Sequence, residues 1–148
     1  MYFLDIVTTV CIGLLIGVEF AVSVFINPTV WKLDDRAQAT AIGLFAKRLG
    51  AAMPLWYAVS LLLLGLEAFL RHHESGFGLL VVAIVIWVVV ILLTVLFLVP
   101  INNRMARLGA DSFPEEARRE HKKWDTLHRL RVAALVVAFV CFLLASHR

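Results

Sequence analysis

Apolar residues gather in four long runs along the chain, and the short segments between them carry most of the charged side chains. The clearest run, residues 77–101, contains no charged residue. A bilayer core about 30 Å thick takes roughly 20 apolar residues of helix, so this run is long enough to cross it. We predict an all-α fold, a transmembrane four-helix bundle that forms one domain over residues 1–148. The expected spans are about 3–26, 50–70, 77–100 and 127–146.

The segment between the first two runs, residues 27–48, has a helical pattern of its own. Asp34 and Asp35 stand near its start and Lys47 and Arg48 at its end, which is the charge order that the helix dipole favours. Apolar residues recur on one face of this segment. We therefore predict a short amphipathic helix that lies flat on the membrane between the first and second spans.

The last helix is expected to begin well before its apolar part. Ser112 precedes Glu115 at the spacing of a capping box, and Pro114 falls in the first turn. Neither glycine nor proline follows before the last residue. We expect one helix from about residue 113 to residue 145, whose charged first half extends beyond the membrane into the cytoplasm.

Composition supports a lipid environment and argues against a nucleic-acid-binding protein. Hydrophobic residues make up 61% of the chain and charged residues 17%, against roughly 45–50% and about 25% in soluble domains. The net charge is only +3, and the basic residues stand beside apolar runs, where anionic lipid headgroups are the natural partners. We expect the lipid bilayer as a partner and no nucleic acid.

The distribution of lysine and arginine predicts the orientation. These residues gather in the segments that follow the first and third apolar runs. The positive-inside rule then puts both segments in the cytoplasm and both termini on the extracytoplasmic side. We expect an integral protein of a bacterial inner membrane.

Two pairs of small residues each leave two interpretations open. Cys11 and Cys141 lie in the first and last apolar runs, where they are either buried thiols or a disulfide that joins the two helices. Gly13 and Gly17 form a GxxxG pair, which packs either against a second copy in a homo-oligomer or within the bundle.

Ionisable residues inside the spans are the first candidates for chemistry. Glu19 and Arg131 both lie too deep to reach water easily, and an unpaired charge in hydrocarbon is costly. We therefore expect them to pair, either to fix the helix register or to serve a function. His128 is expected beside this pair, as a general base, as a proton relay, or simply bonded to a backbone carbonyl.

His121, Trp124, His128 and Arg131 form one helical stripe. A metal site made of Glu19, His121 and His128 is a weaker alternative, because the chain has neither HExxH nor HxxxH spacing. We expect no cofactor. The chain also lacks the Walker, GxGxxG and GxSxG motifs, which leaves nucleotide-binding and serine-hydrolase interpretations unsupported.

Four further polar residues fall near the same predicted boundary as this stripe. They are either helix caps and turn residues or groups that bind a substrate. These residues are Asn27, Arg48, Asn102 and Asn103.

Three stretches together resemble a known family. They are residues 19–28, the Pro-Ile-Asn-Asn sequence at 100–103 and the Trp-Asp-Thr-Leu-His-Arg-Leu-Arg sequence at 124–131. The pattern resembles the anthrone-oxygenase-like family of small four-helix membrane proteins. That resemblance implies a cofactor-independent oxygenase that oxidises a membrane-soluble aromatic phenol, an anthrone, to a quinone.

The resemblance also implies roles for individual residues. His128 would remove a proton from the substrate, and Arg131 and Asn103 would stabilise the resulting oxygen anion. Trp124 would stack on the hydrophobic aromatic molecule. Glu19 is the further catalytic candidate, while Asn27, Arg48 and Asn102 are candidates for substrate binding.

Two other functions fit the same residues. In one, Glu19, His128 and Arg131 relay protons or bind an anion in a small-molecule binding or proton-coupled transport module. In the other, the polar cluster only sets helix packing in a structural membrane subunit without catalysis.

Overall fold

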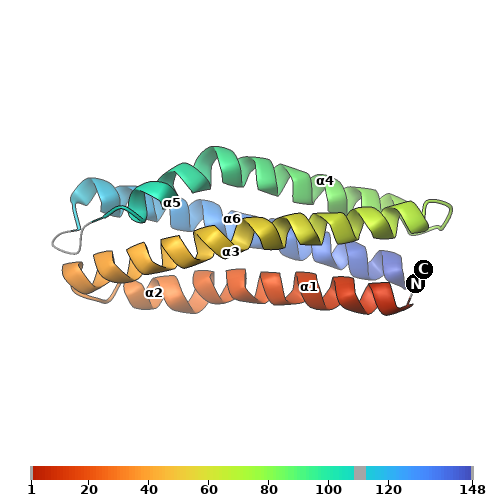
Figure 1. Ribbon diagram of the computed structural model, residues 1–148, viewed down its shortest axis with the longest axis horizontal. Helices are drawn as coiled ribbons and strands as arrows, with labels where there is room; N and C mark the ends of the chain where they lie inside the picture. Colours follow the sequence, from red (N-terminus) through yellow and green to blue (C-terminus); the bar gives the residue numbers. More distant parts are fainter. Residues whose placement is uncertain (1, 109–112, 148) are drawn as a thin grey trace.

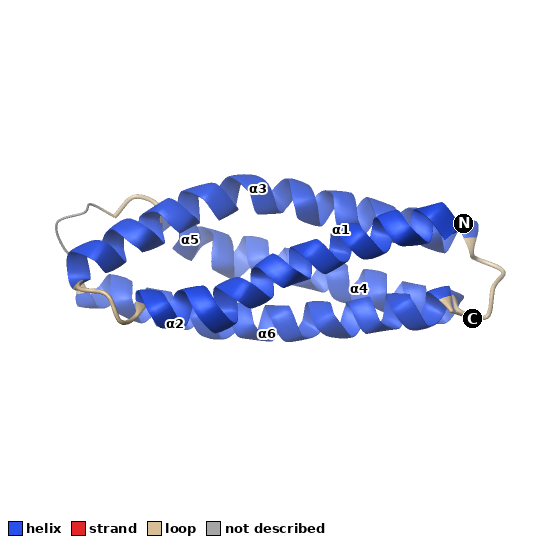
Figure 2. Ribbon diagram, turned by 90° about the horizontal axis from the view of Figure 1, so that it is seen from below, coloured by secondary structure: helices blue, strands red, loops and turns tan. Residues whose placement is uncertain are grey.

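The computed structural model describes residues 2–108 and 113–147, and in these residues the chain forms four long antiparallel helices (Figure 1). Each of the four is long and apolar enough to cross a membrane. This confirms the predicted all-α fold of four candidate spans. Both termini lie at the end of the bundle that holds the turn between the second and third helices (Figure 2). We call this end the hairpin end. We call the opposite end, which holds the two longer connections, the basic end.

The first and third long helices are each built from three consecutive elements. The first comprises α1 (Tyr2–Ala21), the π-helical turn η1 (Val22–Ile26) and α2 (Asn27–Val30). The third comprises α4 (Phe77–Leu93), the π-helical turn η2 (Thr94–Leu98) and α5 (Val99–Met105). The second and fourth are α3 (Asp35–Leu70) and α6 (Glu115–Ser146).

Each of the two π-helical turns ends two residues before a proline. Pro28 follows η1 and Pro100 follows η2, each in the first turn of the α-helix that resumes. Proline lacks an N–H donor and its ring collides with the carbonyl of the preceding turn, so one wider turn accommodates it without ending the helix. The helices therefore continue past the predicted span ends at residues 26 and 100.

The predicted short amphipathic helix between the first two spans is wrong. Its residues are helical, but they are the first part of the continuous helix α3, which begins after Asp34. The Asp34 side chain accepts a hydrogen bond from the backbone N–H of Ala37 at 3.0 Å, as an N-cap should. The apolar face packs against α5 and the start of α6 instead of a membrane surface: Ile42 is buried beside Ile101 and Met105.

The fourth helix agrees with the predicted long helix to within two residues at each end. Helix α6 begins at Glu115, directly after Pro114. The proposed cap residue Ser112 lies outside the described residues. The charged first part does not project alone into solvent, because Ala117 and the preceding Phe113 are buried in the apolar cluster at the basic end.

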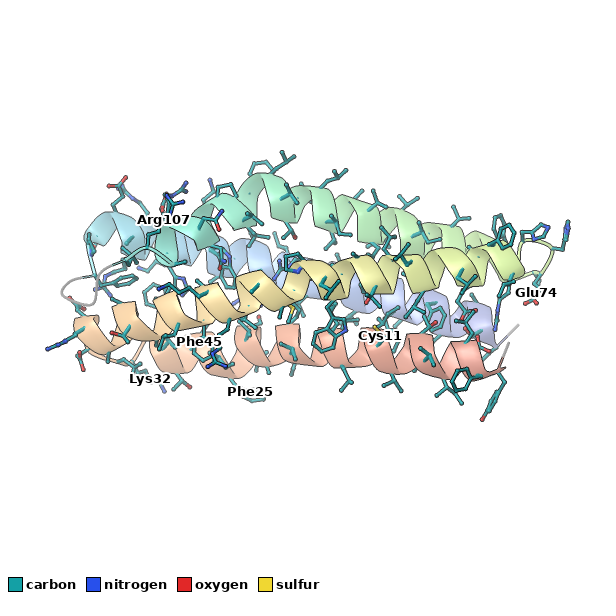
Figure 3. The ribbon with its side chains drawn as sticks, in the orientation of Figure 1. Cys11, Phe25, Lys32, Phe45, Glu74 and Arg107 are labelled. Atoms are coloured by element: carbon teal, nitrogen blue, oxygen red, sulfur yellow. The ribbon has the colours of Figure 1, made fainter. Side chains whose placement is uncertain are left out.

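The main core lies between the helices in the half of the bundle toward the hairpin end. Ile12, Leu15, Leu80, Trp87 and Leu135 are all inaccessible to solvent there. Large apolar side chains also cover the outside of the bundle, and Phe25, 62% exposed, points away from it (Figure 3). A bundle that is apolar on both its inner and outer faces suits a hydrocarbon solvent.

An ionic cluster that the sequence did not reveal fixes the hairpin end. Arg71 is 5% exposed and binds Asp5, Glu67 and Glu74. Glu67 is 1% exposed and also accepts a hydrogen bond from Thr8 at 3.2 Å. The cluster therefore ties the start of α1 to the end of α3.

The two cysteines, Cys11 and Cys141, are free thiols, so the disulfide interpretation does not hold in this structure. A methyl group at Gly13 would lie 3.8 Å from Phe139 of α6, whereas one at Gly17 would meet nothing within 4 Å among the described residues. Half of the GxxxG pair thus packs internally.

Candidate functional site

Glu19 and Arg131 form the predicted ion pair across the bundle. Arg131 Nη2 lies 2.6 Å from Glu19 Oε2, and the two side chains are 11% and 3% exposed. His128 Nδ1 lies 3.2 Å from the same carboxylate oxygen and 2.8 Å from Arg131 Nη2. A carboxylate from α1 thus meets a guanidinium and an imidazole that stand one turn apart on α6.

Tyr57 is the member of this cluster that the sequence did not indicate. Its hydroxyl donates a hydrogen bond to Glu19 Oε1 at 3.0 Å, and its ring lies 5.7 Å from the Arg131 guanidinium carbon. Trp87 Nε1 donates to the Tyr57 carbonyl at 3.2 Å and so helps to hold this turn of α3. In the sequence, a tyrosine in an apolar helix resembles an ordinary core residue. Only its position in the structure, at the same depth as Glu19 and opposite it, identifies it as a member of the cluster.

The hydrogen bonds of His128 define its tautomer. Nε2 lies 3.1 Å from the backbone carbonyl oxygen of Glu19, which can only accept, so Nε2 carries the hydrogen. In a neutral ring, Nδ1 is then the lone-pair nitrogen, and it accepts from Arg131. The carbonyl bond foreseen from the sequence therefore exists, and it leaves Nδ1 as the basic nitrogen beside Glu19.

Arg131 also reaches the third long helix. Its Nη1 donates to Thr94 Oγ1 at 3.3 Å, and Thr94 is the first residue of the π-helical turn η2. The Arg131 Nε atom is buried and has no hydrogen-bond partner among the described residues. The guanidinium thus connects three helices and keeps an unused donor.

The predicted stripe on α6 forms a stack of rings. The Trp124 ring lies 4.6 Å from that of His128, centroid to centroid and nearly parallel, and 5.8 Å from that of His121. The Trp31 ring lies 5.1 Å from that of His121 and is tilted against it by 47°. The stack leads from the basic end to the Glu19 carboxylate.

A cavity of about 480 Å³ lies against this stack, between all four long helices. This volume is within the roughly 300–1,000 Å³ of typical small-molecule sites. Most of the wall is aliphatic. The polar and aromatic side chains that line it are Glu19, Asn27, Phe45, Tyr57, Thr94, Asn102, Asn103, His121, Trp124, His128 and Arg131.

The remaining predicted residues divide between the cavity and the surface. Asn27 lines the cavity but donates to Asp125 Oδ1 at 2.8 Å, and Asn102 donates to the Ala46 carbonyl at 3.0 Å, so both already hold helices together. Asn103 lines the cavity with an exposed side chain. Arg48 is exposed and is not among the residues that line the cavity, so its predicted part in substrate binding stays a prediction.

The alternative metal site is not assembled. In residues 2–108 and 113–147, no group of three or more His, Cys, Asp or Glu side chains is placed to hold a metal ion. His121 stands two helical turns from His128, with Trp124 stacked between their rings, so Glu19, His121 and His128 do not converge on one point.

Comparison with known families identifies the family of the chain. Residues 42–141 match the family model described as anthrone oxygenase, which covers more than half of the chain. The chain belongs to the anthrone oxygenase family. The resemblance inferred from residues 19–28, 100–103 and 124–131 is thereby confirmed. No curated protein and no solved structure matches the chain significantly.

The anthrone oxygenase match covers only part of the site. It includes Tyr57, Trp124, His128 and Arg131, whereas Glu19 precedes its first residue. In this member of the family, the first helix nevertheless supplies the carboxylate on which Tyr57, His128 and Arg131 converge.

Proposed function

We propose that this protein is a membrane oxygenase that oxidises a lipid-soluble aromatic phenol to a quinone without a bound cofactor. The observation that carries the proposal is the position of the Glu19, His128 and Arg131 cluster in the wall of a largely apolar cavity. A base and a cation surrounded by apolar side chains are suited to form and stabilise an aromatic oxyanion. Membership of the anthrone oxygenase family supports the same chemistry.

The closeness of His128 and Arg131 indicates that both act on the same atom of the substrate. Their nitrogens are 2.8 Å apart, so a hydroxyl that reaches one also reaches the other. In the enol tautomer of the substrate, which is a phenol, His128 Nδ1 accepts the hydroxyl proton, Glu19 stabilises the resulting imidazolium, and the guanidinium stabilises the phenolate oxygen. This role for Arg131 follows the sequence prediction, and the role of Asn103, whose exposed side chain lines the same cavity, stays a prediction.

The phenolate then reacts with molecular oxygen at the ring carbon opposite its oxygen. An electron pair from that carbon forms a C–O bond to O₂, and the peroxide oxygen takes up a proton to give a hydroperoxide. Loss of the proton on the same carbon, with cleavage of the O–O bond, releases water and leaves a carbonyl. One O₂ is consumed and one water is formed, so the quinone needs no further oxidant.

We further propose that the substrate enters from the bilayer and that the basic end faces the cytoplasm. Phe45, Gly50, Pro54 and Ala58 of α3 line the cavity and are also exposed on the outer surface of the bundle. These four residues mark a lateral route for an apolar molecule. The excess of lysine and arginine at the basic end supports a cytoplasmic location for it.

The test is oxygen consumption by the purified protein in lipid nanodiscs with anthrone as substrate. Wild-type protein is expected to consume O₂ and form anthraquinone faster than empty nanodiscs, and His128→Ala is expected to fall to the empty-nanodisc rate while keeping its helical circular dichroism. His73→Ala, in the exposed turn at the hairpin end, serves as the matched control. A wild-type rate equal to that of empty nanodiscs, or an unchanged rate in His128→Ala, would overturn the proposal.

A further inference from the structure

The cavity reaches the outer surface of the bundle beside the ionic cluster. Pro54 and Ala58 of α3 and Val95 of η2 line the cavity and are also exposed, and we call the opening between them the window. Thr94, the residue before Val95, also lines the cavity and accepts a hydrogen bond from Arg131 at 3.3 Å. The window therefore leads directly to the guanidinium group.

The course of the third long helix explains the window. Helix α3 packs against α4 and against α5, but it has little contact with η2, which lies between them. A π-helical turn is wider than an α-helical turn, and proline at Pro100 removes a regular hydrogen bond, so a bend is expected there. Figure 1 shows the third long helix bending away from α3 between α4 and α5. The window is thus a feature of the backbone.

The surroundings of the window are apolar. The residues at its edge carry no polar side-chain atoms, and four leucines within one turn of them are exposed: Leu55, Leu62, Leu92 and Leu96. An unfilled apolar gap loses dispersion contacts, and it leaves the charge of Arg131 facing lipid, which is costly. An apolar chain in the window would restore the packing and shield the charge.

We propose that the substrate is a phenol with a long apolar chain, whose ring lies in the cavity while the chain passes through the window into the bilayer. This inference rests on the proposed function and adds to it the class of substrate. The chain is attached next to the oxygen-bearing carbon, because Arg131 binds the oxygen beside the window. The opposite carbon must keep the hydrogen that the reaction removes, so it cannot carry the chain.

A chain that belongs to the substrate suits the window better than the acyl chain of a bilayer lipid. A lipid keeps its polar headgroup at the membrane surface and brings only hydrocarbon to the depth of the spans. Arg131 has a buried Nε donor without a partner among the described residues, and a phenol oxygen can accept from it. An occupant that joins an oxygen to a chain satisfies both the guanidinium and the window.

Two probes that differ only in the chain, 1-naphthol and 2-dodecyl-1-naphthol, test the assignment. Binding is measured at equilibrium by quenching of tryptophan fluorescence in nanodiscs, without O₂ and at equal mole fractions of probe in the lipid. We expect Ala58→Phe, which fills the window, to weaken binding of 2-dodecyl-1-naphthol about tenfold and binding of 1-naphthol less than twofold. Ala52→Phe, at an exposed position of α3 that does not line the cavity, is the matched control and should change neither.

An affinity at equilibrium does not depend on the route of entry, so this measurement separates the position of the chain from the proposed lateral route. Equal weakening of the two probes by Ala58→Phe, or no weakening of either, would overturn the position of the chain while O₂ uptake with anthrone still supported the proposed function. Failure of the wild-type protein both to bind either probe and to consume O₂ would overturn the two proposals together.

Photolabelling of the wild-type protein gives a second readout that needs no variant. A 2-alkyl-1-naphthol with a diazirine in its chain is expected to label α3 and η2 at the window, and excess 2-dodecyl-1-naphthol should prevent the labelling. A phospholipid with a diazirine in its acyl chain is the comparison. If the phospholipid labels the same residues and excess 2-dodecyl-1-naphthol does not reduce that labelling, the window holds bilayer lipid and the proposal is wrong.

Discussion

The Glu19 carboxylate and the Arg131 guanidinium lie 2.6 Å apart although the residues are separated by 112 positions in the sequence. This contact joins the first helix to the last and places opposite charges beside His128 and Tyr57. Each partner is costly without the other in an apolar bundle. The pair therefore has a structural role as well as the proposed catalytic one, and the two can be separated by experiment.

Glu19→Gln is expected to destabilise the protein by about 3 kcal/mol, because Arg131 then stays buried without its counter-charge. Adding Arg131→Met to Glu19→Gln should recover most of the stability and none of the O₂ uptake. Stability is measured by denaturant unfolding in detergent micelles followed by circular dichroism. Glu116→Gln, at an exposed position of α6, is the matched control. Equal stability of the single variant and the wild-type protein would show that the pair does not contribute to folding.

Tyr57→Phe is expected to keep the fold and lower the rate of O₂ uptake about tenfold. The ring can still lie beside Arg131, but the hydrogen bond to Glu19 is lost, and bonds to charged groups contribute about 1.5–3 kcal/mol. Rates are compared at saturating anthrone in nanodiscs. Tyr2→Phe, with a side chain 81% exposed, should leave the rate unchanged. An undiminished rate in Tyr57→Phe would remove the tyrosine from the site.

Gly76→Ala is expected to destabilise the hairpin end by about 1–3 kcal/mol. A methyl group there would lie 2.6 Å from the Ala145 carbonyl oxygen and 3.0 Å from its α-carbon, which are backbone atoms that cannot rotate away. Gly78→Ala is a close control, because nothing lies within 4 Å of the added carbon and helix propensity favours alanine. Thermal unfolding of the two variants in the same detergent should give a lower midpoint only for Gly76→Ala.

Arg71→Gln is expected to cost more stability than Glu67→Gln. The first change leaves Asp5, Glu67 and Glu74 without the cation that binds all three, whereas the second leaves the arginine with two carboxylates. A loss of about 3 kcal/mol is expected for Arg71→Gln, as for other buried charges that lose a partner. Arg107→Gln, exposed at the opposite end, controls for the change in net charge. Equal losses in Arg71→Gln and Glu67→Gln would contradict the central position of Arg71.

The sequence by itself determined the four helices and the pairing of Glu19 with Arg131. Helix length follows from apolar runs, and the cost of an unpaired charge in hydrocarbon requires two deep, opposite charges to meet. The single stripe of His121, Trp124, His128 and Arg131 was equally predictable, because helical periodicity puts those positions on one face. All of these are local properties or follow from one strong energetic rule.

The tertiary structure alone decided which other side chains share the site. Tyr57 lines the cavity and Arg48 is not among its lining residues, although both belong to α3, because the rotation of that helix against its neighbours turns one side chain inward and leaves the other exposed. The same packing made α3 continuous, since its first turns found apolar partners in α5 and α6. Rotation and register depend on how the surfaces of all four helices fit together, and no single segment of sequence carries that information.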